Sequence, residues 1–283
     1  MVIFMEQIRR MGVRLHLSDS QILAACRAYM GDSEGLWEKA QKMRKSGNVA
    51  HCRRALRSNN SAGGAWVLAV ALAMACQAEA DYQRMGIASD VFDATFSDIR
   101  IWAEHYRAKT GVDGLGEIGW IINHCRLKIF RLGRLQFERT SVHFPPFTPF
   151  HKRKLTSVRQ GDHCLGVHIP EGEKLDIDTC ERDFTKAPDF FKRHFPNEQY
   201  ACFTCLSWLL SSVYGEILPQ ESNIVRFHAL WDDVWDVRGD HQAIERIWSS
   251  GDRDARDTLL QQRAAAWLAQ GKRLGMGFGI RRI

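Results

Sequence analysis

The sequence has no apolar run that we expect to cross a bilayer, and we expect no secretory leader from its opening residues. The most apolar stretch, residues 62–76, is shorter than the roughly 18–20 residues that span a membrane, so we interpret it as a buried helix. Near the start, Glu6, Arg9 and Arg10 follow the apolar opening too soon to leave a signal-peptide core. We therefore expect a cytoplasmic protein without membrane association, whose eight cysteines remain reduced.

The sequence also lacks a large excess of one charge and any nucleotide fingerprint. Its 39 Lys and Arg against 33 Asp and Glu give a net charge of +6, which suits an anionic ligand without requiring nucleic acid. Neither a Walker A motif nor a dinucleotide-binding glycine pattern occurs. What is present is a chain of 283 residues, 45% of them hydrophobic, which is enough to fill two domain cores.

Helical periodicity dominates the first part of the chain. Apolar positions between residues 91 and 103 recur three and four residues apart, after a cap at Ser89 or Asp90 and before a stop at Gly111. Further helices are expected from Ser20, after Asp32, over the apolar stretch and from residue 120 onward. The sequence therefore predicts an all-helical N-terminal domain over residues 1–130.

After residue 131 the pattern changes to strands that alternate with helices. Residues 134–139 alternate polar and apolar side chains with period two, as a half-buried strand does. We expect further strands at residues 163–169, 200–210 and 274–280, and helices at 180–194, 215–227 and 258–269. The chain is therefore predicted to be α+β, with a mixed α/β domain over residues 131–283.

Two motifs have the letters of a functional site but not its context. Gly275, Gly277 and Gly279 follow a helix and end the chain, so we expect them to allow a close backbone approach in a strand and not to bind phosphate. Cys202 and Cys205 have the spacing of a metal pair, but a strand would point them to opposite faces and no second pair occurs. We expect buried thiols and no metal.

Charged residues cluster in two places. The acids at positions 232, 233, 236 and 240 alternate with tryptophans, and we expect a solvated loop there, in preference to a cation site. Between residues 126 and 159 only one acid faces nine bases, which are Arg126, Lys128, Arg131, Arg134, Arg139, Lys152, Arg153, Lys154 and Arg159. These bases suit cofactor phosphates, an acidic face of the other domain or, last in rank, a nucleic-acid backbone.

Candidate proton-transfer groups lie at the ends of the expected strands. His168 comes directly before a Pro-Glu-Gly turn, where a side chain can project into a cleft as a general base, although a single histidine is more often structural. Glu138 ends its strand, and Ser207, Trp208 and Tyr214 lie near the end of the third. The sequence shows no recognisable nucleophilic triad among them.

Several blocks of the sequence resemble a family of bacterial acyltransferase-like proteins. They are residues 132–138 (LGRLQFE), 167–172 (VHIPEG), 205–210 (CLSWLL) and 218–224 (LPQESNI), with 84–87 (RMGI) and 97–99 (SDI) in the first half. The resemblance implies a helical N-terminal domain and a C-terminal domain similar to the GNAT fold, a mixed sheet that splits to admit acyl-CoA. In the wider superfamily a Gln/Arg-x-x-Gly-x-Gly/Ala turn binds the pyrophosphate, and residues 171–176 depart from this pattern.

The resemblance implies an acyl-CoA-dependent N-acyltransferase that uses acetyl-CoA or another acyl-CoA and a small-molecule or peptide amine as acceptor. His168 or Glu138 would act as the base, and Ser207 or Tyr214 would return the proton. The residues expected to position the cofactor or the acceptor are Arg134, Gln136, Trp208 and Asn223. The alternative, suggested by the missing pyrophosphate turn, is a non-catalytic module that binds a ligand or peptide on the same fold.

Overall fold

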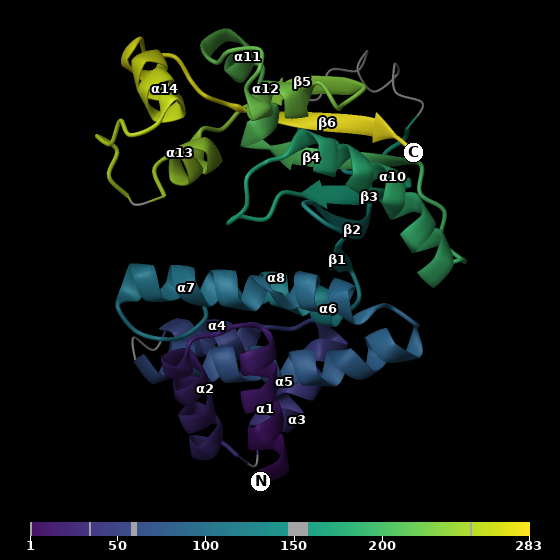
Figure 1. The fold of residues 1–283 in the computed structure, drawn as a ribbon, viewed down its shortest axis with the longest axis vertical. Helices are drawn as coiled ribbons and strands as arrows, with labels where there is room; N and C mark the ends of the chain where they lie inside the picture. Colours follow the sequence, from purple (N-terminus) through teal and green to yellow (C-terminus); the bar gives the residue numbers. More distant parts are fainter. Residues whose placement is uncertain (1, 34, 58–60, 147–157, 250) are drawn as a thin grey trace. The chain divides into compact units, whose positions relative to one another are not determined.

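A computed structural model describes residues 2–33, 35–57, 61–146, 158–249 and 251–283, and Figure 1 shows the order of the elements. The chain divides into two compact units. The first contains Met1–Gln136 and Pro170–Gly172, and the second contains Phe137–Ile169 and Glu173–Ile283. A helical first part followed by a mixed α/β part confirms the predicted fold class.

Helices build the first unit. They are α1 (Val2–Arg14), α2 (Asp19–Gly31), α3 (Leu36–Ser46), α4 (Ala50–Arg57), α5 (Ser61–Arg84), α6 (Ser89–Phe96), α7 (Asp98–Thr110) and α8 (Ile118–Cys125), followed by β1 (Ile129–Arg131). Local sequence sets their ends: Ser18 and Gln21 form a capping box at α2, and Gly111 ends α7 with a left-handed φ of 75°.

Helix α5 is the centre of the first unit. Residues 67–75 are all 0% exposed, and α1, α2, α3, α4 and α8 contact the helix. This confirms a buried helix over the apolar stretch. The helix is longer than expected, and Gly63–Arg84 is the one helix of the described chain that has the length and composition to cross a membrane; 67% of its most apolar window is buried inside the unit.

The second unit is built on strands and helices that alternate. They are β2 (Gln136–Ser141), β3 (His163–His168), α10 (Ile177–His194), β4 (Cys202–Ser207), the 3-10 turn η1 (Trp208–Leu210), α11 (Val213–Ile217), α12 (Asn223–His228), β5 (Asp233–Val237), α13 (His241–Ile247), α14 (Leu259–Ala269) and β6 (Met276–Arg282). The sheet order is β1-β2-β3-β4-β6-β5. Strands β3 and β4 are parallel, whereas β6 is antiparallel to both β4 and β5.

The two faces of the sheet bury different side chains. On one face, Phe184 of α10 packs against Phe137 of β2 and Phe203 of β4. A second apolar cluster contains Cys164, Cys202, Trp235, Phe278 and Ile280 from the strands, together with Val142 and Val158. Because strand side chains alternate, this cluster lies on the face opposite α10.

Three sequence predictions for this unit were wrong in detail. The strand expected at 200–210 ends at Ser207, whose hydroxyl accepts a hydrogen bond from the Leu209 N–H and caps η1. The helix expected at 215–227 is two short helices, because the chain turns at Leu218 and Pro219 cannot supply a helical N–H. The acidic segment contains β5, where a solvated loop was expected.

Candidate active site

His168 and Glu138 form a hydrogen-bonded pair on adjacent strands. The distance from His168 Nε2 to Glu138 Oε2 is 2.9 Å, and the two side chains are 33% and 24% exposed. A carboxylate in this position orients the imidazole, and when Nε2 carries the shared hydrogen, Nδ1 is the ring nitrogen that holds the lone pair. The structure therefore brings together the two residues that the sequence predicts as alternative bases.

Gly166 keeps the space beside this pair open. It lies two residues before His168 on β3, so both positions face the same side of the sheet. A Cβ atom at Gly166 would lie 3.2 Å from Thr140 Cγ2 and 3.5 Å from Glu138 Cβ. Any larger residue at this position would press on the strand that carries Glu138.

The parallel strands β3 and β4 pair only over a short length next to this site. Their register joins Leu165 with Phe203 and Gly166 with Thr204, whereas β4 and β6 pair at six positions. Two residues further along each strand lie His168 and Leu206, and Leu206 is 49% exposed. The titratable pair and an exposed apolar side chain thus lie at the same end of a parallel strand pair.

The other predicted proton donors lie elsewhere in the second unit. Tyr214 is buried in an apolar cluster with Leu274 and Trp248, and its ring packs edge-on against Trp208 at a centroid distance of 5.4 Å. Burial raises the pKa of Tyr214, so its hydroxyl stays protonated, and within the described part of the chain that hydroxyl has no hydrogen-bond partner. Ser207 caps η1, and strand alternation places it on the face opposite Leu206.

The predicted positioning residues have separate surroundings. Arg134 and Gln136 are buried in the first unit, where Gln136 Nε2 donates a hydrogen bond to Asp98 Oδ2 at 2.8 Å. Asn223 is the first residue of α12, behind the cap Ser222. The structure therefore gives Gln136 a partner in the core of the first unit, and it places Asn223 at the start of a helix of the second unit.

The described arginines of the basic segment lie in separate surroundings. Arg131 and Arg134 are each 5% exposed, and Arg139 forms an ion pair with Glu198. Lys152, Arg153, Lys154 and the end of the Pro-rich loop that begins at residue 143 lie outside the described residues. Arg131, Arg134 and Arg139 are therefore buried or paired, and these three side chains are unavailable to a polyanion.

The cysteine and aspartate motifs have structural roles. Cys202 and Cys205 are buried on opposite faces of β4, and burial raises the pKa of Cys202 to about 12, so the thiol stays protonated. Asp236 accepts hydrogen bonds from the backbone N–H and the hydroxyl of Ser212, and Asp240 accepts one from the Gly275 N–H. Across the described ranges, no group of three or more His, Cys, Asp or Glu could hold a metal.

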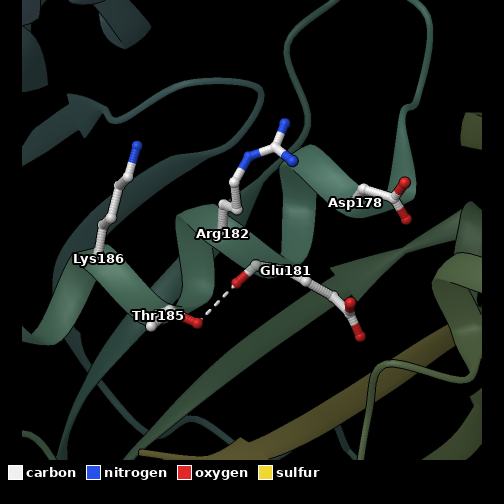
Figure 2. A pocket seen from close by; sticks show the side chains of 5 residues that line it. All are labelled: Asp178, Glu181, Arg182, Thr185 and Lys186. Carbon is white, nitrogen blue, oxygen red and sulfur yellow. Dashed lines mark hydrogen bonds between the residues drawn. The ribbon is translucent and has the colours of Figure 1, made fainter.

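A hollow of about 380 Å³ lies along the exposed side of α10, and its lining contains neither His168 nor Glu138. Figure 2 shows that its lining comes from this helix alone, with Thr185 Oγ1 donating to the carbonyl oxygen of Glu181. The lining residues are Asp178, Glu181, Arg182, Thr185 and Lys186. Substrate pockets are lined mostly by apolar groups, so this mixed-charge surface is not the candidate site.

Some residues of functional interest were missed by the sequence reasoning. Asp98, Trp120 and His124 form a buried network with Gln136, and His105 pairs with Glu171. Trp120 and His124 are one turn apart on a short helix, and this spacing indicates that their side chains lie on the same side of it. No sequence pattern indicates the pairing of His105 with Glu171, because those residues are far apart in the sequence.

Comparison with known proteins accounts for nearly the whole chain. Residues 129–281 match the family described as the GNAT-like C-terminal domain, and residues 9–127 match the N-acyltransferase N-terminal domain. No curated protein matched.

Solved structures share the fold at low sequence identity. One is an acyltransferase variant in complex with octanoyl-CoA, with a TM-score of 0.76 and 22% identity over 98% of this chain and 88% of that one. Another is an acyltransferase in complex with decanoyl-CoA and teicoplanin, with a TM-score of 0.75 and 22% identity over the same shares, 98% and 88%. The family matches and the arrangement of the sheet lead to one assignment: the chain belongs to the family of proteins with a GNAT-like C-terminal domain, preceded here by an N-acyltransferase N-terminal domain.

Proposed function

We propose that the protein transfers an acyl group from an acyl-CoA to an amine of a small-molecule or peptide acceptor. The observation that carries this proposal is the His168–Glu138 pair, with its Nε2–Oε2 distance of 2.9 Å, at the end of the short parallel pairing of β3 and β4. Membership of the family and the acyl-CoA bound in structures of the same fold support it.

The chemistry needs a base, because an ammonium group has no lone pair with which to attack a thioester. In our mechanism the acceptor nitrogen attacks the carbonyl carbon and forms the C–N bond, while His168 Nδ1 takes the nitrogen's proton. Glu138 stabilises the resulting imidazolium through the hydrogen bond to Nε2. The C–S bond then breaks, and the CoA thiolate takes the proton that the His168 imidazolium holds, which restores the neutral base.

The apolar part of the donor has a matching surface. Leu206 is half exposed at the same strand end as His168, whereas Trp235 and Phe278 on the same face of the sheet are buried beside it. Each methylene that such a surface buries contributes roughly 0.8 kcal/mol. We therefore propose that medium-chain acyl groups, such as the octanoyl and decanoyl groups bound by proteins of this fold, bind more tightly than acetyl.

The proposal is tested first by binding and then by turnover. Titration with CoA, acetyl-CoA, octanoyl-CoA and decanoyl-CoA by calorimetry is expected to show affinity that rises with chain length. Release of free thiol is then followed with a panel of amines, and His168→Gln and Glu138→Gln are each expected to lower kcat by roughly 100-fold or more.

The matched control is His163→Gln, which changes an exposed histidine at the start of the same strand. It is expected to keep wild-type kcat. If no acyl-CoA binds, the enzyme proposal is wrong, and the non-catalytic binding module that the departure at residues 171–176 suggests takes its place. If both site variants keep full turnover, the assignment of His168 and Glu138 to the reaction is wrong.

A further inference from the structure

The chain passes between the two units at three places, and two of them adjoin the His168–Glu138 pair. The crossings follow Gln136, Ile169 and Gly172. Glu138 lies two residues after the first crossing, and His168 lies one residue before Ile169. The position of both side chains therefore depends on how firmly the first unit holds residues 136 and 170–172.

The first of these anchors is a buried hydrogen-bond network. Gln136 is 1% exposed and donates from Nε2 to Asp98 Oδ2 at 2.8 Å. The same carboxylate oxygen accepts hydrogen bonds from Trp120 Nε1 at 2.7 Å and from His124 Nε2 at 3.0 Å. A carboxylate held by three donors in a dry environment is rigid, so the start of β2 is fixed in position.

The second anchor holds the turn that follows β3. Glu171 Oε2 lies 2.8 Å from His105 Nε2, and the His105 ring also packs edge-on against Trp102 at a centroid distance of 5.3 Å. Glu171 belongs to the short segment Pro170–Gly172 that the contacts assign to the first unit. This is also the segment in which the sequence departs from the pyrophosphate turn of the wider superfamily.

Both anchors are on one helix. Asp98 and His105 are seven residues apart on α7, which is two helical turns, so their side chains lie on the same side of that helix. One rigid element thus holds the backbone close to each member of the pair.

We infer that α7 positions the catalytic pair, with Asp98 and His105 as positioning residues that act through Gln136 and Glu171. The inference rests on the proposed function, because it assigns the helical unit a role in that reaction. A base and its carboxylate partner must be held within about 0.5 Å of their working geometry, and small displacements of such groups lower rates strongly. Loss of either anchor is therefore expected to lower kcat more than it changes the KM for the acyl-CoA.

The test uses one variant at each anchor. Gln136→Met removes the amide at nearly constant volume and leaves Asp98 with two donors, and Glu171→Ala removes the acceptor for His105. Each is expected to lower kcat roughly tenfold while the KM for octanoyl-CoA changes less than about twofold. Glu171→Gln, which still offers His105 a carbonyl oxygen, is expected to restore most of the loss.

Two controls separate positioning from general destabilisation. Asp113→Ala breaks the ion pair between Asp113 and Arg107, which also involves α7, and it is expected to leave kcat unchanged. In a Glu138→Gln background, Gln136→Met is expected to have no further effect, since its action depends on Glu138. The inference would be overturned if Gln136→Met lowered kcat equally in the wild-type and Glu138→Gln backgrounds. It would also be overturned if Asp113→Ala lowered kcat as much as the anchor variants do.

A measurement without turnover keeps this inference separate from the proposed function. The histidine ring signals of isotope-labelled protein report the surroundings of His168, identified by its absence in His168→Gln. Gln136→Met and Glu171→Ala are expected to shift that signal, whereas Asp113→Ala is not. If wild-type protein transfers no acyl group but the shifts appear, the proposed function fails and the anchoring stands; if the signal does not move, the anchoring itself is wrong.

Discussion

At the scale of single residues, the site depends on side chains that are small as much as on those that react. Gly166 lies on the same face as His168, and the space that its missing side chain leaves borders Glu138 and Thr140. A contact of 3.2 Å is closer than carbon atoms normally approach, so a methyl group there must displace a neighbour. Both Thr140 and Glu138 belong to β2, the strand that carries the proposed carboxylate partner of His168.

Gly166→Ala is therefore expected to affect the reaction more than the fold. We expect a loss of about 1 kcal/mol in the free energy of unfolding from overpacking. We expect a fall in kcat of roughly tenfold from displacement of Glu138. Denaturant unfolding and steady-state kinetics on the same preparations measure both. A variant with reduced stability and unchanged kcat would show that the space beside Glu138 has no role in the reaction.

The sequence predicts His168 and Glu138 as alternative bases, because each lies near a strand end, but it does not predict that the two side chains pair. Their hydrogen bond depends on the pairing of β2 with β3, which are separated by a long connection, and no local pattern specifies that register. The prediction that Gln136 positions the cofactor or the acceptor likewise does not include its burial against Asp98, because that burial is set by tertiary packing.

At the scale of secondary structure elements, β6 shows how a glycine-rich strand serves packing. It lies between β4 and β5, and Gly277 is paired with Ser207 on one side and with Asp236 on the other. A Cβ atom at Gly277 would clash with the backbone carbonyl oxygen of Leu210 in η1. The close approach expected from the sequence is confirmed, and its partner is the turn that ends β4.

Gly277→Ala is expected to lower the free energy of unfolding by about 3 kcal/mol, because the clash is with backbone and no rotamer change relieves it. The matched control is Gly215→Ala in α11, where no other heavy atom lies within 4 Å of the added Cβ. That change is expected to be neutral or to stabilise by about 0.5–1 kcal/mol. Equilibrium denaturation of both variants measures the difference, and equal stabilities would contradict the close approach.

Elements with strong local signals were predicted well, and those defined by tertiary contact were not. The periodic helix α10 and the strand β3 appeared close to their expected bounds, as did α14 with the capping box of Thr258 and Gln261. Strand β5 was missed because its aspartates disfavour strands. In the structure Trp235 packs against Phe278, and Asp236 accepts hydrogen bonds from Ser212.

At the scale of the whole molecule, both units contain carboxylates whose interactions favour the ionised form. Burial alone would raise the pKa of Asp98, but hydrogen bonds from His124, Gln136 and Trp120 outweigh it and lower that pKa below the ordinary 3.8. In the second unit, the hydrogen bond from Arg139 lowers the pKa of Glu198 below 4.5. A group with a lowered pKa in the folded state stabilises the protein at pH values above its unfolded pKa and loses that contribution as the pH falls.

Acid is therefore expected to unfold the protein through these groups, and Asp98 can be isolated by substitution. At pH 7, Asp98→Asn is expected to lower the free energy of unfolding by about 1–3 kcal/mol, since a buried hydrogen-bond network loses its ionised acceptor. Below pH 3.8 the wild-type carboxylate gains a proton in the unfolded chain first, so the gap between wild type and variant narrows as the pH falls. Urea unfolding at pH 7, 5, 4 and 3 measures this difference in the free energy of unfolding. The control is Asp178→Asn, a change at an exposed ion pair with Arg226, and we expect its free energy of unfolding to equal that of wild type at each pH. A gap that stays constant down to pH 3 would mean that the Asp98 network stabilises the fold by packing alone and not by holding a charge.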